Sequence, residues 1–213
     1  MGEFKFMSEV ADFSRYSPTV IADVLSRERV MDMGIRPLWN SMPRISGPAF
    51  TVKCEPGENL MLHAAIHRAP KGSVIVVESG DINFALAGGN VCKVAQKNGI
   101  AAFVLDGVIR DVAEIRNMGF PVFCRGVIPI PGAKKCYREL NKSVVICGGV
   151  KVSPGDIIVA DEEGIVAVSY DTLESVLQKA KERLAKNDSE TLELWEKNHR
   201  AKIDELVQKY SVI

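Results

Sequence analysis

The sequence predicts an α/β fold with a charged helical extension at its C-terminal end. Two continuous apolar runs, GSVIVVES (72–79) and IAAFVL (100–105), are typical of strands that are buried on both faces. A glycine-containing turn and a short helical pattern follow each run, and a third apolar run, FPVFCRGVIP, occupies 120–129. Strands that alternate with short helices at this spacing indicate βαβ units and a parallel segment of sheet.

The remaining elements follow from local start and stop signals. Ser17 and Pro18 favour a helix start, Asn59 and Pro70 bound a second helix, and Asn90 is able to cap a third. Gly-Gly, Pro-Gly and Glu-Gly turns separate the short apolar runs of the later sequence, which indicates hairpins. The expected elements are helices over 17–30, 59–70, 88–99 and 106–119, a strand over 46–57, and antiparallel hairpins over 144–169.

From 171 onward the sequence is charged and helical. Leu173, Val176, Leu177 and Ala180 form an apolar stripe, which is typical of a helix that docks on its own core or on a neighbouring subunit. We therefore expect a core domain over 1–170 and a helical extension over 171–213 that packs on a neighbouring subunit.

The composition narrows the class of protein. With 213 residues, 46% hydrophobic and 25% charged, the chain has the composition of an ordinary globular protein, and a formal net charge of zero gives no field that attracts nucleic acid or an anionic membrane. MGEFKFMSEV, at the start, lacks the pattern of a secretory signal, and no apolar segment reaches membrane-spanning length. The spacing of the five cysteines predicts neither a zinc site nor a disulfide framework, so we expect a reducing, cytoplasmic location and cysteines that are mostly core residues, namely Cys54, Cys92, Cys124, Cys136 and Cys147.

Two loops of the central βα units carry the residues best suited to bind a ligand or a metal. The chain leaves adjacent parallel strands at the same edge of a sheet, where open α/β sheets bind ligands, so Gly88 and Gly89 should lie near Arg110 and Asp111. The glycines allow close approach to the backbone, and helix N-termini favour an anion. Arg110 offers a planar fork for a carboxylate, and Asp111 offers hard oxygen ligands for Mg²⁺ or Mn²⁺. Together these residues predict a binding site for a small carboxylate that chelates a metal.

Each of these residues also has a purely structural interpretation. An aspartate in a first helical turn is favoured by the helix dipole, an Arg-Asp pair is often solvated, and Gly-Gly is often only a turn. His63 and His67 stand four apart and could grip a metal, but a structural pair is the default. Asp106 could also face the site, but its default is an Asp-Gly turn residue. Arg125 could face the same edge, with a structural ion pair as its default, and Asp161 is expected to be a turn acid.

The stretch LAGGNVCKVAQKNGIAAFVLDGVIRDVAEIRNMGFPVFCRG resembles a known family. The family contains regulator of ribonuclease E activity A (RraA) and the 4-hydroxy-4-methyl-2-oxoglutarate/4-carboxy-4-hydroxy-2-oxoadipate aldolases. The resemblance extends to SPTVIADVL, GPAFTVKCEPGENLMLHAAI and SPGDIIVADEEGIVAVS, and covers roughly 14–170. It implies an α/β/β/α sandwich, like a swivelling phosphohistidine domain, in a homotrimer or homohexamer with active sites at subunit interfaces.

The aldolases of this family are divalent-metal-dependent lyases that release pyruvate, and many decarboxylate oxaloacetate. The resemblance implies that Gly88, Gly89, Asn90 and Val91 hold the 2-oxo acid, that Arg110 binds it and supports catalysis, and that Asp111 binds Mg²⁺ or Mn²⁺. The regulator branch tends to lack the aspartate after the arginine, whereas this chain has it. The aspartate therefore favours the aldolase or decarboxylase branch. The alternative is a non-catalytic regulator that binds a ribonuclease or another protein.

Two features depart from the family pattern or leave it open. Some members have an acidic residue at the second position of the glycine-rich loop, where this chain has Gly89. In some aldolases a neighbouring subunit donates a further acid from its C-terminal helix, for which the candidates are Glu182, Asp188 and Glu190. No residue is evident as the base for the substrate hydroxyl, so a water molecule on the metal is the expected proton relay.

Overall fold

The computed structural model describes residues 13–211 of the chain. The expectation that the first ten residues are not a secretory signal therefore lies outside the described residues. Within 13–211, no helix combines the length and apolar character that crossing a membrane requires.

A seven-stranded mixed sheet forms the centre of the fold. Its strands are β1 (Arg36–Pro37), β2 (Ile45–Lys53), β3 (Val74–Glu78), β4 (Ala102–Asp106), β6 (Val122–Cys124), β10 (Ile157–Asp161) and β11 (Gly164–Val168). They lie in the order β1-β6-β4-β3-β2-β10-β11, with β2, β3, β4 and β6 parallel and the other pairings antiparallel. The parallel segment expected from the alternating pattern is thus confirmed.

Two small sheets and six helices complete the described chain. Strands β5 (Val108–Ile109) and β7 (Gly126–Val127) pair in parallel, and β8 (Val145–Cys147) and β9 (Val150–Val152) form a hairpin. The helices are α2 (Pro18–Ala22), α3 (Leu60–Ala65), α4 (Gly89–Lys97), α5 (Val112–Met118), α6 (Leu173–Ser189) and α7 (Leu192–Tyr210), with 3₁₀ turns η1 (Arg27–Arg29) and η2 (Tyr170–Thr172).

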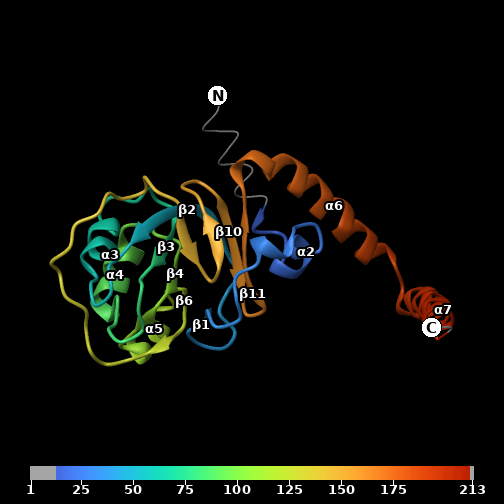
Figure 1. Cartoon of the computed structure of the whole chain (residues 1–213), viewed down its shortest axis with the longest axis horizontal. Coiled ribbons are helices and arrows are strands. Elements are labelled where there is room, and N and C mark those ends of the chain that lie inside the picture. Colours follow the sequence, from blue (N-terminus) through green and yellow to red (C-terminus); the bar gives the residue numbers. More distant parts are fainter. Residues whose placement is uncertain (1–12, 212–213) are drawn as a thin grey trace.

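The elements stack in four layers. Helices α3, α4 and α5 cover one face of the parallel strands, and α2 and α6 cover the outer face of β10 and β11 (Figure 1). Because successive strand residues face opposite ways, Ile75 packs toward the helices while Val76 packs in a second cluster with Ala160 of β10. This arrangement confirms the expected α/β/β/α sandwich.

Three expected helices are shorter in the structure, and the one expected over 59–70 spans only Leu60–Ala65. The helix expected over 17–30 ends at Ala22, although Ser17 caps it as predicted by accepting from the Val20 amide over 3.3 Å. Arg29 instead bonds to the Ala167 carbonyl over 2.6 Å and to Asp156 over 2.7 Å, which holds the chain against β11. Residues 108–109, expected in a turn and helix, form β5 because they pair with β7.

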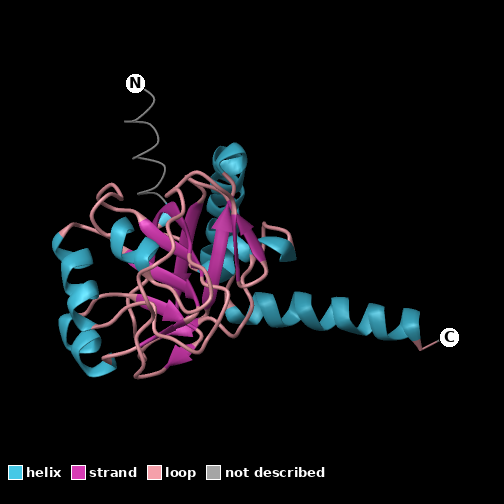
Figure 2. Cartoon of the chain, turned by 60° about the vertical axis from the view of Figure 1, so that its left-hand side comes forward, coloured by secondary structure: helices cyan, strands magenta, loops and turns pink. Residues whose placement is uncertain are grey.

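The C-terminal helices behave differently from each other. Leu173, Val176 and Ala180 of α6 are buried against β10, β11 and α2, so this stripe packs on the core of its own chain. Helix α7 has no buried residue and extends away from the body (Figures 1 and 2). The expected extension therefore divides into one helix that packs on the core of its own chain and one helix that has no buried residue.

Candidate functional site

Hydrogen bonds join two loops at one edge of the sheet. The loop from β3 to α4 ends at Gly88 and Gly89, and the loop from β4 to α5 contains Arg110 and Asp111. The Gly89 amide donates to Asp111 Oδ2 over 3.0 Å, and the Arg110 amide donates to the Ala87 carbonyl over 3.1 Å. The juxtaposition expected from adjacent βα units is confirmed.

The two glycines are required for this close approach. A Cβ atom at Gly88 would collide with Asp111 Oδ2 and lie 3.0 Å from Arg110 Nε, and a Cβ atom at Gly89 would collide with Glu114 Oε2. Gly88, in an extended conformation with φ −152°, is the N-cap of α4. The expectation that Asn90 caps this helix is therefore wrong, because Asn90 is its second residue.

Asp111 has an unusual backbone conformation. Its φ of 63° and ψ of 39° place it in the left-handed region immediately before α5. Asp tolerates this region better than most residues, but the conformation still costs on the order of 1–2 kcal/mol. It aims the carboxylate back toward α4, where Arg110 Nε lies 3.5 Å from Asp111 Oδ2. Such strain is concentrated at functional sites.

A cavity of about 140 Å³ opens beside these loops. Gly88, Asn90, Val91, Arg110 and Asp111 line it, whereas the remaining predicted residue, Gly89, is buried beside Glu114. The amides of Asn90 and Val91 have no acceptor within α4, because the first turn of a helix leaves its N–H groups unpaired. One wall of the cavity thus presents free N–H donors, a guanidinium and a carboxylate.

The opposite wall contains residues that the sequence did not indicate. Asn59 and His63 reach it from the start of α3, and Lys134 reaches it from the segment that follows β7. The histidine pair was assigned a structural role by default, yet His63 faces the cavity while His67 is exposed in the turn that follows α3.

Glu114 is a further cavity residue that the sequence reasoning missed. It lies three positions after Asp111, and residues at that spacing share one face of a helix, so the spacing could have indicated it. Its carboxylate occupies the space beside Gly89. The chain thus places an acid next to the second position of the glycine-rich loop without having one in the loop.

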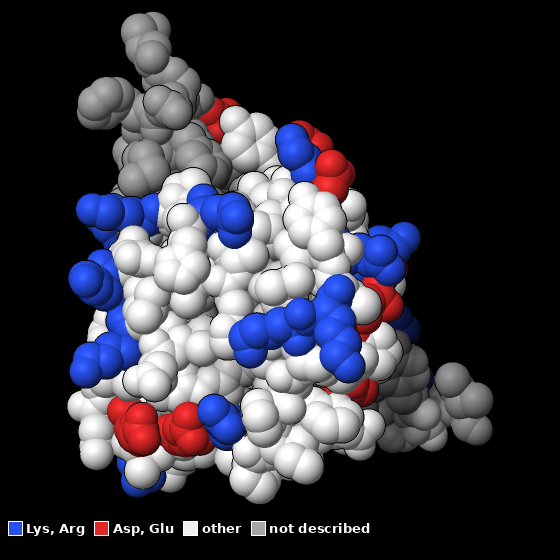
Figure 3. Space-filling view, turned by 90° about the vertical axis from the view of Figure 1, so that its left-hand side faces the viewer, with Lys and Arg blue, Asp and Glu red and all other residues white. Residues whose placement is uncertain are grey.

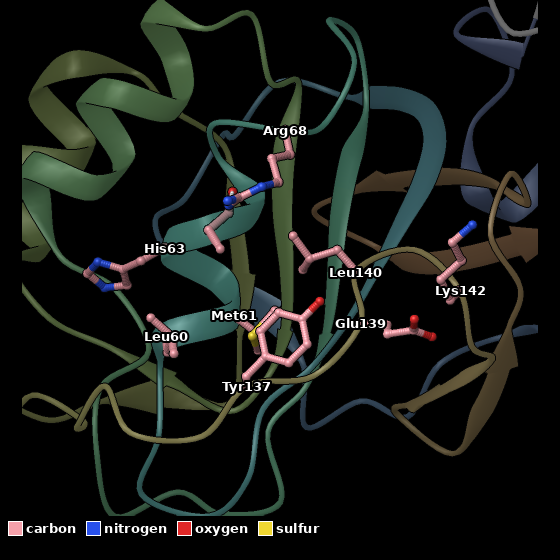
Figure 4. Close-up of a pocket in the computed structure, with 9 residues that line it drawn as sticks. Leu60, Met61, His63, Arg68, Tyr137, Glu139, Leu140 and Lys142 are labelled. Atoms are coloured by element: carbon pink, nitrogen blue, oxygen red, sulfur yellow. Dashed lines mark hydrogen bonds between the residues drawn. The ribbon is translucent and has the colours of Figure 1, made fainter.

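A larger cavity of about 560 Å³ lies between α3 and the segment 137–142. His63 stands at its edge, apart from Tyr137, Leu140 and Lys142 (Figure 4). Its lining includes neither the glycine loop nor the Arg-Asp pair. The smaller cavity, where those groups meet, is therefore the candidate site.

The cavity lining carries two cations, Arg110 and Lys134, and two carboxylates, Asp111 and Glu114. Burial lowers the pKa of His63 from 6.5 to about 4, and the charge of Lys134 acts in the same direction, so the imidazole is neutral at pH 7. Lys and Arg side chains are more prominent than Asp and Glu on the side of the molecule that carries α3 and α4 (Figure 3). This setting favours an anionic ligand.

The other charged candidates are structural. Arg125 donates to Asp106 and bonds Asp32 over 2.7 Å, while the second oxygen of Asp106 accepts from the Gly148 amide over 2.8 Å. Asp161 accepts from the Glu163 amide within its turn. The default interpretation is confirmed for Arg125 and Asp161. Asp106, expected as a turn residue, is instead the last residue of β4 and pairs with Arg125.

The buried cysteines are not suited to nucleophilic chemistry. All five are free thiols, and four are buried while Cys136 is exposed. Burial raises the pKa of Cys92, the thiol nearest the site loops, to about 12, so the reactive thiolate is scarce at neutral pH. The expectation that the cysteines are mostly core residues is confirmed.

The donor set of the cavity fits a hard divalent cation. Asp111 and Glu114 offer two carboxylates, and the described residues contain no group of three or more His, Cys, Asp and Glu side chains arranged for a metal. Mg²⁺ is commonly held by one or two carboxylates, with waters and ligand oxygens completing its shell. The residues present match that mode and not the nitrogen and sulfur cage of structural zinc.

Comparison with known proteins places these features in a family context. The RraA-like family, described as Aldolase/RraA, matches residues 18–167. A protein of Halalkalibacterium halodurans named "Putative 4-hydroxy-4-methyl-2-oxoglutarate aldolase" is 37% identical over 181 residues, which cover 84% of this chain and 85% of the relative.

Two solved structures share the fold. Streptomyces coelicolor RraAS2, described as an unusual member of the RNase ES inhibitor RraA protein family, superposes with a TM-score of 0.74 at 26% identity, covering 91% of this chain and 96% of that one. The RNA-processing inhibitor RraA from Thermus thermophilis has a TM-score of 0.64 at 25% identity, covering 70% and 90%. The match therefore extends through most of the described chain.

Proposed function

Since the chain belongs to the RraA-like (Aldolase/RraA) family, we propose that it is a divalent-metal-dependent lyase that releases pyruvate. Its substrates are 2-oxo acids of the 4-hydroxy-4-methyl-2-oxoglutarate type, oxaloacetate, or both. The observation that carries the proposal is the hydrogen-bonded meeting of the Gly88-Gly89 turn with Arg110 and Asp111 in one cavity. The halodurans relative's name supports the same reaction class.

Each residue has a defined task in this reaction. The free amides at the start of α4 bind the substrate carboxylate, and Arg110 faces the 2-keto oxygen. When the C3–C4 bond breaks, by retro-aldol cleavage or by loss of carbon dioxide, negative charge develops on that oxygen. A preorganised cation such as Arg110 can lower the barrier by about 3 kcal/mol.

Asp111 would hold Mg²⁺ or Mn²⁺, and Glu114 would add a second carboxylate beside it. When bound, the cation supplies Lewis-acid polarisation of the keto group. The strained backbone of Asp111 is explained by this role, because it points the carboxylate at the place where the two loops meet.

The test is pyruvate release from oxaloacetate and from 4-hydroxy-4-methyl-2-oxoglutarate, followed by a coupled assay with and without Mg²⁺ or Mn²⁺. We expect metal-dependent release in the wild type and a loss of about 100-fold or more in Asp111→Ala. Asp171→Ala, which removes an exposed carboxylate of η2, is the matched control and should retain activity. Absence of release from both substrates with either metal contradicts the proposal.

A second candidate function is a non-catalytic regulator that binds a ribonuclease or another protein. The similarity to the RNA-processing inhibitor RraA favours it. The discriminating result is inhibition of an RNase E-type ribonuclease by the chain, unchanged in Asp111→Ala, together with no pyruvate release.

Assembly and location complete the proposal. The chain forms a homotrimer or homohexamer in which α7 packs on a neighbouring subunit, and Glu182, Asp188 or Glu190 contributes an acid near the neighbour's site. None of these three acids lines the cavity of its own chain. A reducing, cytoplasmic location fits the five free thiols.

A further inference from the structure

The larger cavity beside α3 has no task in the proposed reaction. Its volume of about 560 Å³ lies in the range of about 300–1,000 Å³ that is typical of small-ligand sites. Leu60, Met61 and Ala64 line it from α3, and Leu140 lines it from the segment opposite. Apart from His63, it shares no lining residue with the candidate site. It is therefore a second concave site, with apolar side chains on two of its walls.

Hydrogen bonds hold the wall opposite α3 in place. This wall is the segment 137–142, which contains no helix or strand. The Asn141 amide donates to the Thr51 carbonyl over 3.0 Å, and the Thr51 amide donates to Asn141 Oδ1 over 3.1 Å. The Arg138 amide donates to Met61 Sγ over 3.2 Å. These bonds tie the wall to β2 and α3, so little conformational freedom is left for a ligand to remove.

Tyr137 presents an aromatic ring to this cavity. The side chain is 72% exposed, although the segment that carries it is fixed on both sides. Figure 4 shows the ring beside Met61, with Leu140 on the other side of the cavity. Aromatic rings stack on one another with an offset, and a methionine sulfur also contacts rings favourably. The cavity therefore offers a planar apolar ligand a ring and a thioether together.

Arg68 supplies a positive charge at the mouth of the same cavity. Its Nη1 donates to the Ala64 carbonyl over 3.1 Å, which uses one of the five N–H donors of a guanidinium. No carboxylate pairs with this guanidinium among residues 13–211. The other two charged groups of the lining, Glu139 and Lys142, are opposite in sign and lie beyond Leu140 from Arg68 (Figure 4). The charge of Arg68 is therefore available to a ligand with one negative charge.

We propose that this cavity binds a small aromatic carboxylate. The ring stacks on Tyr137 between Met61 and Leu140, and the carboxylate pairs with Arg68. The planar fork of a guanidinium matches the two oxygens of a carboxylate, and the ring supplies the apolar area that the walls can cover. The ligand is held without covalent chemistry and outside the candidate lyase site, so the inference does not depend on the proposed reaction.

The role of the charge is tested by isothermal titration calorimetry with 3-phenylpropionate and its uncharged amide, 3-phenylpropanamide. Arg68→Gln should weaken binding of the carboxylate about tenfold and leave the amide within about twofold. Arg110→Gln removes the cation of the other cavity and is the matched control, so it should bind both probes as the wild type does. A loss in Arg110→Gln with none in Arg68→Gln places the probe in the other cavity and overturns the proposal.

The role of the ring is tested with Tyr137→Ala. This variant should bind both phenyl probes about fivefold more weakly, because the stacking partner is lost whether or not the probe is charged. Tyr170→Ala removes an exposed aromatic side chain that does not line the cavity, and it should change neither affinity. Both tyrosines are more than half exposed, so their removal leaves the core packing intact. Wild-type affinity of Tyr137→Ala for both probes overturns the stacking.

The full-length chain is used in its assembled form, so that an occupant from a neighbouring subunit is also detected. If a neighbouring subunit fills the cavity, neither phenyl probe binds at concentrations up to about 10 mM, and the ligand assignment is overturned. The titrations contain no 2-oxo acid and follow binding alone. Their outcome is therefore independent of whether the chain releases pyruvate.

Discussion

At the scale of single residues, Gly88 controls the geometry of the site. An added Cβ atom would displace the side chains of Asp111 and Arg110, both of which are partly exposed and able to move. Gly88→Ala should therefore fold normally and release pyruvate about 100-fold more slowly, because a misplacement of about 1 Å costs that much. Gly126→Ala is the matched control, since its Cβ would meet only Val108 Cγ1 at 3.9 Å. Equal activity of the two variants in the coupled assay contradicts this prediction.

His63 should make stability depend on pH in a defined window. Its pKa is depressed from 6.5 to about 4 in the folded chain, chiefly by burial. Between these values the unfolded chain binds a proton that the folded chain does not, so stability falls as pH falls from 6.5 to 4 and this contribution does not change further below. A hydrogen bond from Arg125 lowers the pKa of Asp32 below its ordinary value of 3.8. Asp32 therefore affects stability only below about pH 3.8.

The measurement is the midpoint of thermal unfolding at pH 7 and pH 4.5. His63→Gln keeps a polar side chain but removes the titration, so its midpoint should drop less than that of the wild type over this interval. An identical drop in both proteins would show that His63 does not carry the effect.

At the scale of secondary-structure elements, Arg125 ties four segments together. Its partners are Asp106 at the end of β4 and Asp32 before β1, and Asp106 also holds the β8–β9 turn through the Gly148 amide. Arg125→Met leaves two partly buried carboxylates without their cation and should lower the free energy of unfolding by about 2 kcal/mol. Arg116→Met, on the exposed face of α5, should change it by less than about 0.5 kcal/mol. Urea denaturation gives the free energy of unfolding of each variant. Similar values for the two variants would contradict a structural role for Arg125.

The same scale shows what could be predicted from the sequence. Gly88 and Asp111 were predictable because loops after adjacent parallel strands meet at one edge, and their strands had clear apolar runs. The loop after β2 reaches the same edge and carries Asn59, but the sequence does not reveal that β2 lies beside β3. Lys134 comes from an irregular segment placed by backbone bonds to Gly57 and Glu58, and such a segment has no periodicity to detect.

At the scale of the whole molecule, the folded body and α7 differ in how far their apolar side chains are buried. Three apolar clusters fill the four layers, and α6 completes the last of them. Helix α7 adds nothing to these clusters, yet it exposes large apolar side chains, namely Leu192, Leu194, Trp195, Ile203, Val207 and Tyr210. A helix that exposes so much apolar surface is stabilised when a partner covers it.

Removal of α7 should therefore change assembly and leave the fold of the body intact. A chain that ends at Ser189 keeps every buried residue of α6, so its thermal midpoint should stay within a few degrees, whereas light scattering should show a smaller oligomer than the full chain. Trp195→Glu with Ile203→Glu should act like the truncation, because each places a charge on the apolar surface. Glu196→Ala with Asp204→Ala, on the polar face, is the matched control and should assemble as the wild type does. A full chain with the mass of a single subunit, or a truncated chain with the full oligomer, contradicts packing of α7 on a neighbour.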